Sequence, residues 1–277
     1  MEDSGSLSRI NQKVQALQKI FSSYRSVLIS YSGGVDSALL AYIAHDVLGD
    51  RASCAILDSP VLPRRALIDA KNIAARIGIV CTVLPDPLLD CKEFSDNPPD
   101  RCYFCKKAGA ALLRHHARLV GADALVDGLN ISDCDQYRPG IRASDEEGIR
   151  HPFIDAGITK QEIRVIAREM GLPFWNKPSE ACLSSRIAYS ESITVPKLAM
   201  IEAAEDILKD FGLFQVRVRL HQELARIEIP VSELDILLPR RDEIVHSFRN
   251  LGFHYITLDL EGFRSGSMDE VLSRDPR

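Results

Sequence analysis

A strand-like run, a glycine-containing turn and the start of a helix follow one another near the amino terminus. Residues 26–31 are largely apolar, Ser32-Gly33-Gly34-Val35-Asp36-Ser37 forms the turn, and residues 38–48 have a helical pattern. A helix that begins directly after a strand directs its unpaired backbone N–H groups and the positive end of its dipole toward one point. Gly33 and Gly34 allow positive φ and a close approach of backbone to ligand. The segment therefore predicts a phosphate-binding turn.

The side chains of this turn indicate which phosphate chemistry to expect. Ser32 and Ser37 add hydroxyl donors, and Asp36 offers a carboxylate to a magnesium ion held against the phosphates. No lysine follows the second glycine, unlike the P-loop that holds β- and γ-phosphates. The hexapeptide instead resembles the PP-loop of the ATP pyrophosphatase family, whose members release pyrophosphate and leave a substrate adenylated. An ordinary strand–turn–helix corner is the alternative interpretation.

Composition indicates a soluble globular protein. The chain has 277 residues, of which 45% are hydrophobic and 26% charged. This length suffices for one large domain or for a large and a small one. No apolar run approaches the ~20 residues that span a bilayer, and the acidic, polar start of the chain is unlike a secretory signal peptide. We therefore expect a cytoplasmic protein without a membrane partner.

Net charge bears on whether the protein binds nucleic acid, and the number of cysteines bears on disulfides and metal binding. The formal net charge is −5, without a dense block of Lys or Arg. Because proteins that bind polyanions usually present a concentrated basic face, a nucleic-acid partner is not expected. Seven cysteines in a cytosolic chain do not indicate a disulfide framework. Closely spaced cysteines suggest a metal instead.

Strand and helix patterns alternate through the first part of the chain. Strand-like runs occupy residues 27–30, 54–57, 80–84 and 124–127, and helical patterns occupy residues 38–48, 64–77 and 105–120. This alternation predicts an α/β fold with a parallel sheet covered on both faces. Ligands of such sheets bind at the carboxyl ends of the strands, where the PP-loop lies. The resemblance adds that this domain is of the adenine-nucleotide alpha hydrolase type.

The pattern changes after Arg186. A helix over residues 196–211, strands over 215–220 and 224–229, a helix near 240–250 and a strand over 255–260 follow. We therefore predict a PP-loop domain over residues 1–187 and a smaller α/β domain over residues 188–277, for substrate binding or oligomerisation. Between the fourth strand and these elements, residues 130–150 are polar with little periodicity, which favours a functional or disordered loop.

Three cysteines form a candidate metal site. Cys102 and Cys105 form a C-x-x-C pair, which the upstream prolines place in a loop or at a helix start, and Cys182 lies far away in sequence. Such a pair serves redox chemistry or half of a zinc site, for which His151 is an available fourth ligand. Three thiolates without a fourth ligand suit a four-iron cluster with one exchangeable iron. Spacing alone leaves these alternatives open.

The other four cysteines have no such pattern. Cys54 and Cys81 fall within apolar strands, and we expect them in the core. Cys91 and Cys134 are not assigned to a site.

Segments across nearly the whole chain resemble the LarE family, ATP-dependent sulfur transferases of nickel-pincer nucleotide biosynthesis. These segments are residues 32–37, 101–107, 127–130, 137–140, 178–186, 217–219, 225–228 and 258–267. The resemblance implies a substrate, the mononucleotide of pyridinium-3,5-dicarboxylic acid, whose carboxylates become thiocarboxylates. Transfer of AMP turns a carboxylate into an acyl-adenylate, from which AMP departs readily when sulfur attacks. Asp36, through Mg²⁺, and Cys182 are the expected catalytic residues.

The resemblance also bears on the sulfur source. Some members carry only the cysteine that matches Cys182 and lose its sulfur, leaving dehydroalanine. Cys102 and Cys105 match members that bind a four-iron, four-sulfur (4Fe-4S) cluster. A cluster held by Cys102, Cys105 and Cys182, resupplied by an external sulfur donor, is therefore implied. Without a cluster, Cys182 itself should attack, with Arg186 favouring its thiolate.

A phosphorylated dicarboxylate requires fixed positive charge in its pocket. Arg217 and Arg219 alternate along one strand and share a face, and arginine suits forked recognition of phosphate or carboxylate. We predict that both bind substrate together with Arg186; solvated arginines are the alternative. Glu228 is either a cross-strand partner of an arginine or a ligand of a second metal. Asp58, at the end of the second strand, is expected near the adenosine unless it only caps a turn.

Several assignments remain open. Arg138 and Arg142 either close over the nucleotide or the product, or they are solvated loop residues. tRNA 2-thiolation with a three-cysteine cluster is the main alternative function, but it predicts a basic face or extra zinc-binding cysteine pairs. An amide-forming synthetase would leave the three cysteines unexplained, and a nucleotide-sensing module with structural zinc is the non-enzymatic alternative. Family analogy predicts a homo-oligomer.

Overall fold

The computed structural model describes residues 4–134, 139–178, 181–264, 266–268 and 270. The chain divides into two compact units. The first unit comprises Met1–Ser59, Arg64–Leu88 and Cys102–Glu180, and the second comprises Pro60–Pro63, Leu89–Arg101 and Ala181–Arg277. The division into folding domains near residue 188 stays a prediction. In the described part of the chain, no helix has the length and apolar character to cross a membrane.

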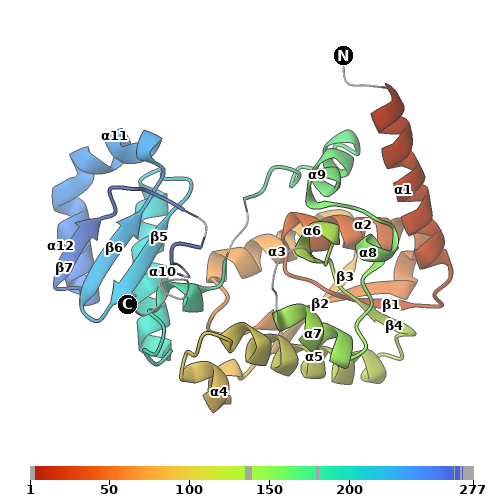
Figure 1. Ribbon diagram of the computed structural model, residues 1–277, viewed down its shortest axis with the longest axis horizontal. Coiled ribbons are helices and arrows are strands. Elements are labelled where there is room, and N and C mark those ends of the chain that lie inside the picture. Colours follow the sequence, from red (N-terminus) through yellow and green to blue (C-terminus); the bar gives the residue numbers. More distant parts are fainter. Residues whose placement is uncertain (1–3, 135–138, 179–180, 265, 269, 271–277) are drawn as a thin grey trace. The chain divides into compact units, whose positions relative to one another are not determined.

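The first unit is built on a four-stranded parallel sheet (Figure 1). Its strands are β1 (Val27–Ser30), β2 (Ala52–Asp58), β3 (Val80–Pro85) and β4 (Ala124–Val126), in the order β3-β2-β1-β4. Figure 1 shows α2 (Val35–Leu48) and α3 (Arg64–Ile77) above this sheet and α5 (Arg101–Leu119) below it. The predicted α/β class with a doubly covered parallel sheet is confirmed.

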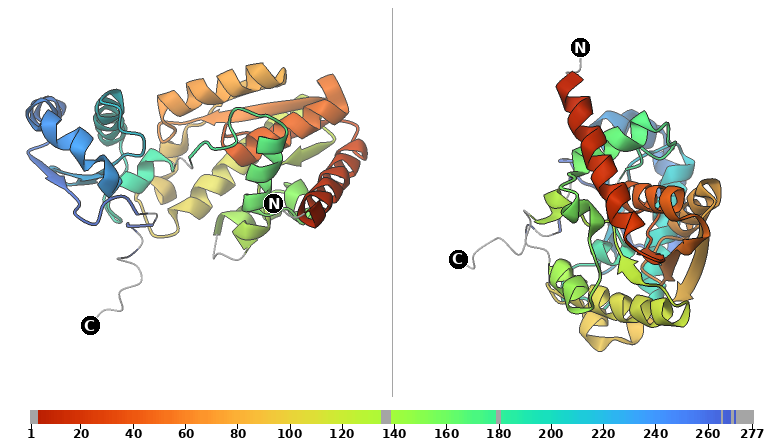
Figure 2. Two further views of the ribbon diagram at one scale, coloured as in Figure 1. Left: turned by 90° about the horizontal axis from the view of Figure 1, so that it is seen from above. Right: turned by 90° about the vertical axis from the view of Figure 1, so that its right-hand side faces the viewer.

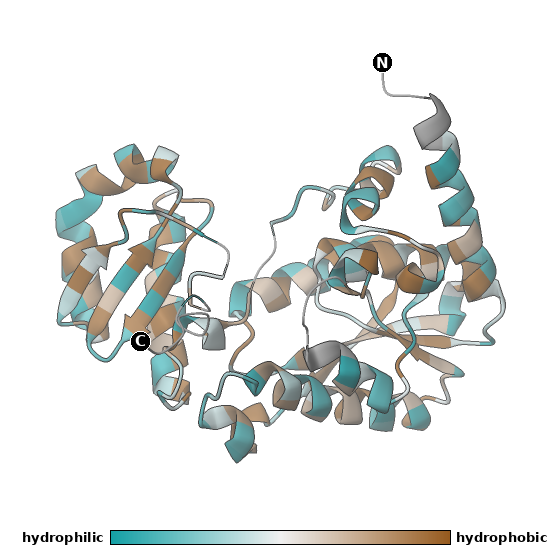
Figure 3. Cartoon of the chain, in the orientation of Figure 1, coloured by the Kyte–Doolittle hydropathy of each residue, from teal (hydrophilic) through white to brown (hydrophobic). Residues whose placement is uncertain are grey.

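Burial on both faces explains why the strands appear as continuous apolar runs. On one face, Leu28 of β1 and Ala55 of β2 pack in a buried cluster with Leu113 of α5. On the other, α2 is buried along most of its length, because α1 (Ser4–Ser22) and α9 (Lys160–Glu169) cover its outer side. Figure 2 shows α1 at the outside of the unit. In Figure 3, α5 carries both brown and teal residues, as expected of a helix with one buried side.

The strand order places the PP-loop at a switch point, where consecutive connections of the sheet run in opposite directions. β1 lies between β2 and β4, so the connections from β1 and toward β4 diverge at its carboxyl end. Gly128, two residues after β4, comes so close to α2 that a Cβ there would lie 3.0 Å from the backbone nitrogen of Ser37. This close approach brings together the segments that follow β1 and β4.

The prediction of a loop over residues 130–150 is wrong for the described residues. The segment contains α6 (Ile131–Cys134) and α7 (Pro139–Glu146), followed by α8 (Pro152–Asp155). Arg150 also forms a parallel bridge with Val126 of β4, which extends the sheet. Helices this short carry too few apolar residues to show a period. Residues 135–138, including Arg138, lie outside the described part of the chain.

The second unit contains a three-stranded mixed sheet. β5 (Arg217–His221) pairs antiparallel with β6 (Leu224–Glu228), which pairs parallel with β7 (Tyr255–Leu258). α10 (Val195–Asp210) packs on β5 and on α12 (Arg241–Leu251), and the short helices α4 (Lys92–Ser95) and α11 (Leu234–Leu237) also belong to this unit. The predicted helices and strands of this region are present. The mixed sheet agrees with the predicted smaller α/β unit.

The alternation along β5 gives its sheet two different faces. Buried Val218 and Leu220 alternate with Arg217 and Arg219, so one face is apolar and the other carries the arginines. The register pairs Arg217 with Glu228 and Arg219 with Arg226, which brings these charged residues to the same face. The predicted shared face of Arg217 and Arg219 is confirmed.

We predict that Gly33→Ala destabilises the protein more than Gly171→Ala. Both glycines have positive φ, at 72° and 68°, so both variants incur the left-handed cost of about 1–2 kcal/mol. Only at Gly33 does an added Cβ meet another atom, lying 2.4 Å from the Cβ of Ala70, whereas nothing lies within 4 Å at Gly171. Overpacking should therefore lower the free energy of unfolding by a further ~1–3 kcal/mol. Denaturant titration measures both values, and equal losses would contradict the prediction.

Candidate active site

The PP-loop of the first unit is ordered by its two serines. The side-chain oxygens of Ser32 and Ser37 lie 3.1 Å apart, and the Ser37 hydroxyl donates to the carbonyl of Gly34 at 3.2 Å. The backbone N–H of Ser32 donates to the Ser37 hydroxyl at 3.2 Å. Gly34 is the N-cap of α2 and supplies no side-chain cap, so no capping side chain blocks the helix start. This arrangement suits an anion at the amino end of α2.

Asp36, in the first turn of α2, is paired with a lysine that the sequence analysis did not identify. Lys160 Nζ donates to Asp36 Oδ1 at 2.6 Å. Burial raises the pKa of the Asp36 carboxyl, although the hydrogen bond and the charge of Lys160 oppose that rise. A half-buried carboxylate beside the phosphate-binding turn fits an oxygen ligand for Mg²⁺. The amine of Lys160 lies beside the same carboxylate. It is therefore a second positive charge, in addition to Mg²⁺, that phosphate oxygens could contact.

Lys160 is positioned by the start of α9. Thr159 is the N-cap of this helix and forms a capping box with Glu162, and Lys13 of α1 donates to Glu162 at 2.6 Å. The backbone N–H of Lys160 donates to the Ser132 hydroxyl at 3.2 Å. Nothing in the local sequence pattern indicates that the side chain of Lys160 meets Asp36 in the first turn of α2.

His151 and two aspartates lie after the last strand of the first unit. His151 Nδ1 is 2.6 Å from Asp127 Oδ1, and its Nε2 is 3.0 Å from Asp145 Oδ1. Burial would lower the pKa of His151, but hydrogen bonds and charges from the two aspartates raise it to about 8. Both ring nitrogens are engaged within the protein. This arrangement does not support the alternative in which His151 is a zinc ligand.

Cys182 lies in the second unit, at the start of a short 3₁₀ helix, η3 (Leu183–Arg186). Its side chain is exposed, and its Sγ lies 3.0 Å from the Ser184 hydroxyl. Arg186 Nη1 donates to the carbonyls of Ala181 and Cys182 at 2.8 and 3.1 Å. The Cys182 backbone is therefore held while its thiol stays accessible.

A buried ion pair anchors Arg186. Its Nε donates to Glu205 Oε1 at 2.8 Å and its Nη2 to Glu205 Oε2 at 3.1 Å, and both side chains are nearly inaccessible. Glu205 also accepts from the backbone N–H of Val218. Forked pairing of this kind fixes a guanidinium in position. The N–H groups of Arg186 donate to Glu205 and to the backbone of the Cys182 loop. The role of Arg186 in substrate binding stays a prediction.

Arg219 forms the second buried network of this unit. Its Nη2 donates to Glu228 Oε2 and to the Ser267 hydroxyl, each at 2.9 Å, and its Nη1 donates to the carbonyl of Ser185 at 2.7 Å. Arg226 also donates to Glu228, at 2.9 Å. Glu228 is therefore a cross-strand partner of arginine, as one of the two interpretations stated. Sequence analysis did not identify Ser267 as part of this network.

Arg217 differs from its neighbours because no carboxylate pairs with it among the described residues. Its side chain is 9% exposed, its guanidinium lies 4.4 Å from the ring centre of Phe263, and Nη1 makes a long contact of 3.4 Å to the Arg264 carbonyl. Burial and the nearby charges of Arg219 and Arg186 lower the pKa of Arg217 to about 10. A buried guanidinium without an acidic partner is a site that an anion would stabilise.

Cys102 and Cys105 lie in the first turns of α5, so the predicted helix-start position is confirmed. Cys102 is exposed and Cys105 half-buried, and neither is in a disulfide. Arg142 lies over the Tyr103 ring and pairs with Glu146. Within the described residues, no three His, Cys, Asp or Glu side chains are grouped as a metal site. The cluster therefore stays a prediction.

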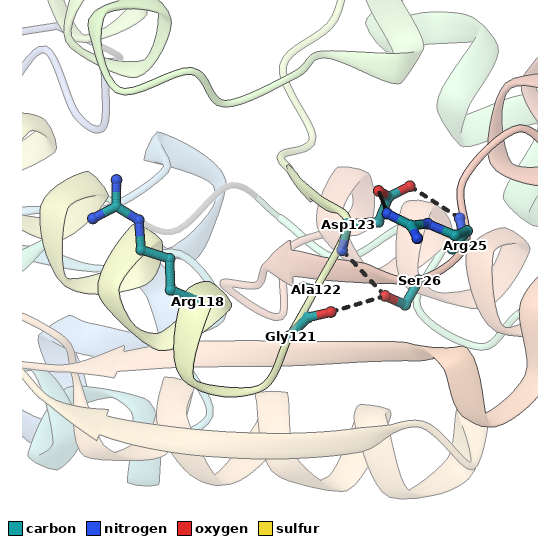
Figure 4. A pocket seen from close by; sticks show the side chains of 6 residues that line it. All are labelled: Arg25, Ser26, Arg118, Gly121, Ala122 and Asp123. Atoms are coloured by element: carbon teal, nitrogen blue, oxygen red, sulfur yellow. Dashed lines mark hydrogen bonds and ion pairs between the residues drawn. The ribbon is translucent and has the colours of Figure 1, made fainter.

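Two further features lie near the sheet of the first unit. Asp58, the last residue of β2, accepts from Arg64 Nη1 at 2.5 Å, and its role at the adenosine stays a prediction. A shallow pocket of about 490 Å³ is lined by Arg25, Arg118 and Asp123 among others (Figure 4). It lies at the amino ends of β1 and β4, away from the PP-loop, and Arg25 already pairs with Asp123 at 3.2 Å. We therefore do not assign it to the active site.

Comparison with known proteins identifies the family. The NAD synthase family model matches residues 8–87, the part that contains the PP-loop. An uncharacterized protein of Synechocystis is 42% identical over 96% of this chain and 100% of its own length, and one of Methanocaldococcus jannaschii is 31% identical over 87% and 92%. The pyridinium-3,5-bisthiocarboxylic acid mononucleotide synthase of Lactiplantibacillus plantarum is 33% identical over 97% of this chain and 98% of its own length. The chain therefore belongs to the LarE family of ATP-dependent sulfurtransferases, which carry a PP-loop.

Proposed function

We propose that this enzyme converts the carboxylates of pyridinium-3,5-biscarboxylic acid mononucleotide to thiocarboxylates, for nickel-pincer nucleotide biosynthesis. The observation that carries the proposal is an accessible Cys182 on a loop that is fixed to the same sheet as Arg217. Arg217 is a buried guanidinium that has no acidic partner among the residues that the structure describes. Similarity to the L. plantarum enzyme over nearly the full length of both chains supports the same substrate.

The first step is adenylation of a substrate carboxylate. Hydroxide is a poor leaving group, whereas AMP departs readily from an acyl-adenylate. The α2 amino terminus and the Ser32 and Ser37 hydroxyls would bind the pyrophosphate portion of ATP. Mg²⁺ bound at Asp36 would offset charge on the phosphate oxygens. Once the Asp36 carboxylate has a metal partner, the amine of Lys160 can donate to phosphate instead.

The second step is attack of sulfur on the activated carbonyl, with Cys182 at the reacting carbon. Arg186 and Arg219 each donate to backbone carbonyls of the segment that carries this residue. We infer that these arginines position the thiol, because each of them is also anchored by a buried ion pair, Arg186 to Glu205 and Arg219 to Glu228. Arg217 would bind the phosphate or the second carboxylate of the substrate.

We further propose that Cys102, Cys105 and Cys182 hold a four-iron, four-sulfur cluster. All three thiols are at least partly exposed and outside disulfides, and three thiolates are suitable ligands for such a cluster. The cluster would supply a sulfide for delivery, which would allow repeated turnover with an external donor. Loss of sulfur from Cys182 is the alternative route for the same reaction.

Assembly as a homo-oligomer is a further proposal. Phe214, Val231 and Leu238 of the second unit are 71%, 60% and 55% exposed, although large apolar side chains favour burial. Contacts between copies of this unit would cover such residues.

We predict that Asp36→Asn and Cys182→Ser separate the two steps. Asp36→Asn should lower ATP-dependent AMP formation by about 10²–10³-fold, because it removes the charge that holds Mg²⁺. Cys182→Ser should keep substrate-dependent AMP formation and yield no thiocarboxylate. Chromatography of AMP and of the thio-product measures both quantities. Thio-product formation by Cys182→Ser at the wild-type rate would refute the role of this thiol.

We predict that methionine substitutions at two arginines of β5 change different properties, stability for Arg219 and substrate binding for Arg217. Arg219→Met leaves Glu228 buried, with its main partner removed, and should lower the free energy of unfolding by about 3–5 kcal/mol. Arg217→Met breaks no ion pair among the described residues, so it should change stability little and raise KM for the dicarboxylate nucleotide ~10–100-fold, since hydrogen bonds to charged groups contribute about 1.5–3 kcal/mol. Denaturant titration and steady-state kinetics test the pair. A large stability loss for Arg217→Met with unchanged KM would argue against substrate binding.

We predict about four irons and a similar amount of labile sulfide per chain after anaerobic purification. Cys102→Ala and Cys105→Ala should lose this iron, whereas Cys91→Ala, which changes an unassigned cysteine, should keep it. Elemental analysis provides the measurement. One zinc per chain would instead indicate a structural metal. Loss of one H₂S mass from the Cys182 peptide after turnover would establish the sacrificial route.

A further inference from the structure

Two cysteines outside the proposed active site are direct neighbours in the sheet of the first unit. Cys54 of β2 and Cys81 of β3 are Cα partners in the parallel ladder. Directly opposed residues of neighbouring strands point to the same face, so the two side chains lie next to each other, and hydrogen bonding between them shifts the pKa of both thiols. Both are reduced in the structure. The expectation that they are ordinary core residues does not account for this pairing.

The pair lies on the sheet face that meets α3. Tyr31, which follows β1, lies near both thiols, and its hydroxyl donates to the Ala70 carbonyl of α3 at 3.3 Å. Ala70 is also the residue against which Gly33 of the PP-loop packs. The thiols are thus in the layer that supports the nucleotide-binding turn, although they take no part in the proposed reaction.

The two thiols are not equivalent. Cys54 is fully buried, whereas Cys81 is partly exposed on β3, the edge strand of the sheet. The hydrogen bond from Cys54 lowers the pKa of Cys81, and nearby Lys71 adds to this effect although burial opposes it. The same hydrogen bond, together with burial, raises the pKa of Cys54. Cys81 is therefore the thiol that an external reagent meets, and it is the better nucleophile.

The backbone geometry allows a bond between the two sulfurs. Neighbouring strands lie about 4.7–4.9 Å apart. Disulfide-bonded cysteines have Cα atoms about 4.4–6.8 Å apart, so the strands need not separate or close appreciably. The register of β2 and β3 continues on both sides of the pair, which holds the cysteines in place.

We propose that Cys54 and Cys81 form a thiol–disulfide site that reacts with low-molecular-weight disulfides of the glutathione class. The Cys81 thiolate attacks the external disulfide, forms a mixed disulfide and releases one thiolate. Cys54 then loses its proton and attacks the Cys81 sulfur, which releases the second external thiolate. Two protein thiols are oxidised to one disulfide, and one external disulfide is reduced to two thiols. The product covalently links β2 to β3 beneath α3.

Peptide mapping of the full-length protein tests this proposal. Protein purified under reducing, anaerobic conditions is treated with excess glutathione disulfide, then unfolded and alkylated so that buried thiols also react. We expect linked Cys54 and Cys81 peptides, two hydrogen masses lighter than the reduced pair, that separate again with dithiothreitol. Full alkylation of both cysteines, or glutathione that persists on Cys81, would overturn the proposal.

Two variants provide matched controls. Cys54→Ala removes the resolving thiol, so glutathione should accumulate on Cys81. Cys81→Ala removes the accessible thiol, so Cys54 should remain fully alkylatable after unfolding. A variant with Cys54→Ala that carries no glutathione would show that Cys81 is not reactive and would overturn the proposed order of attack. Peptide mapping of the wild-type protein alone can support or overturn the proposal, so the test does not depend on the stability of either variant.

Discussion

The close approach of backbone segments at the carboxyl ends of β1 and β4 is the constraint on which the nucleotide site depends. Gly33 lies against Ala70, and Gly128 lies against the backbone of Ser37, with no room at Gly33 for a Cβ and little at Gly128. These contacts hold the turn and the start of α2 at the carboxyl ends of the strands, where the connections diverge. The N–H groups of the helix, Asp36 and Lys160 then meet at one place, although they come from distant parts of the sequence.

The second unit is constrained differently, because several charged side chains, arginines and glutamates, are buried inside a small fold. Desolvation makes each buried arginine costly unless a carboxylate compensates it. Glu205 compensates Arg186 and Glu228 compensates Arg219, and both pairs also fix the segment that carries Cys182. Arg217 has no such partner among the described residues. Arg186 and Arg219 are neutralised within the protein, whereas Arg217 can still bind an anion. This difference is the physical basis for assigning different roles to residues of the same type.

Sequence reasoning succeeded where local pattern and environment coincide. The strands are buried on both faces, so apolar runs located β1 and β2 within a few residues, and period-two alternation placed Arg217 and Arg219 on one face. It failed for α6 and α7, which are too short and polar to show a helical period. It also did not identify Lys160, because the partner of this lysine is Asp36, 124 residues away. Local patterns carry no information about such pairs.

The amino-acid sequence by itself determined the alternation of strands and helices, the phosphate-binding turn and the family resemblance, because these depend on residue type, order and short-range spacing. Tertiary structure alone decided which charges are compensated and which thiols are neighbours. Arg217 and Arg219 look equivalent along β5, and Cys54 and Cys81 look like isolated core residues. Only the register of adjacent strands and the packing around them gave Arg219 a carboxylate, left Arg217 without one among the described residues, and placed the two cysteines opposite each other.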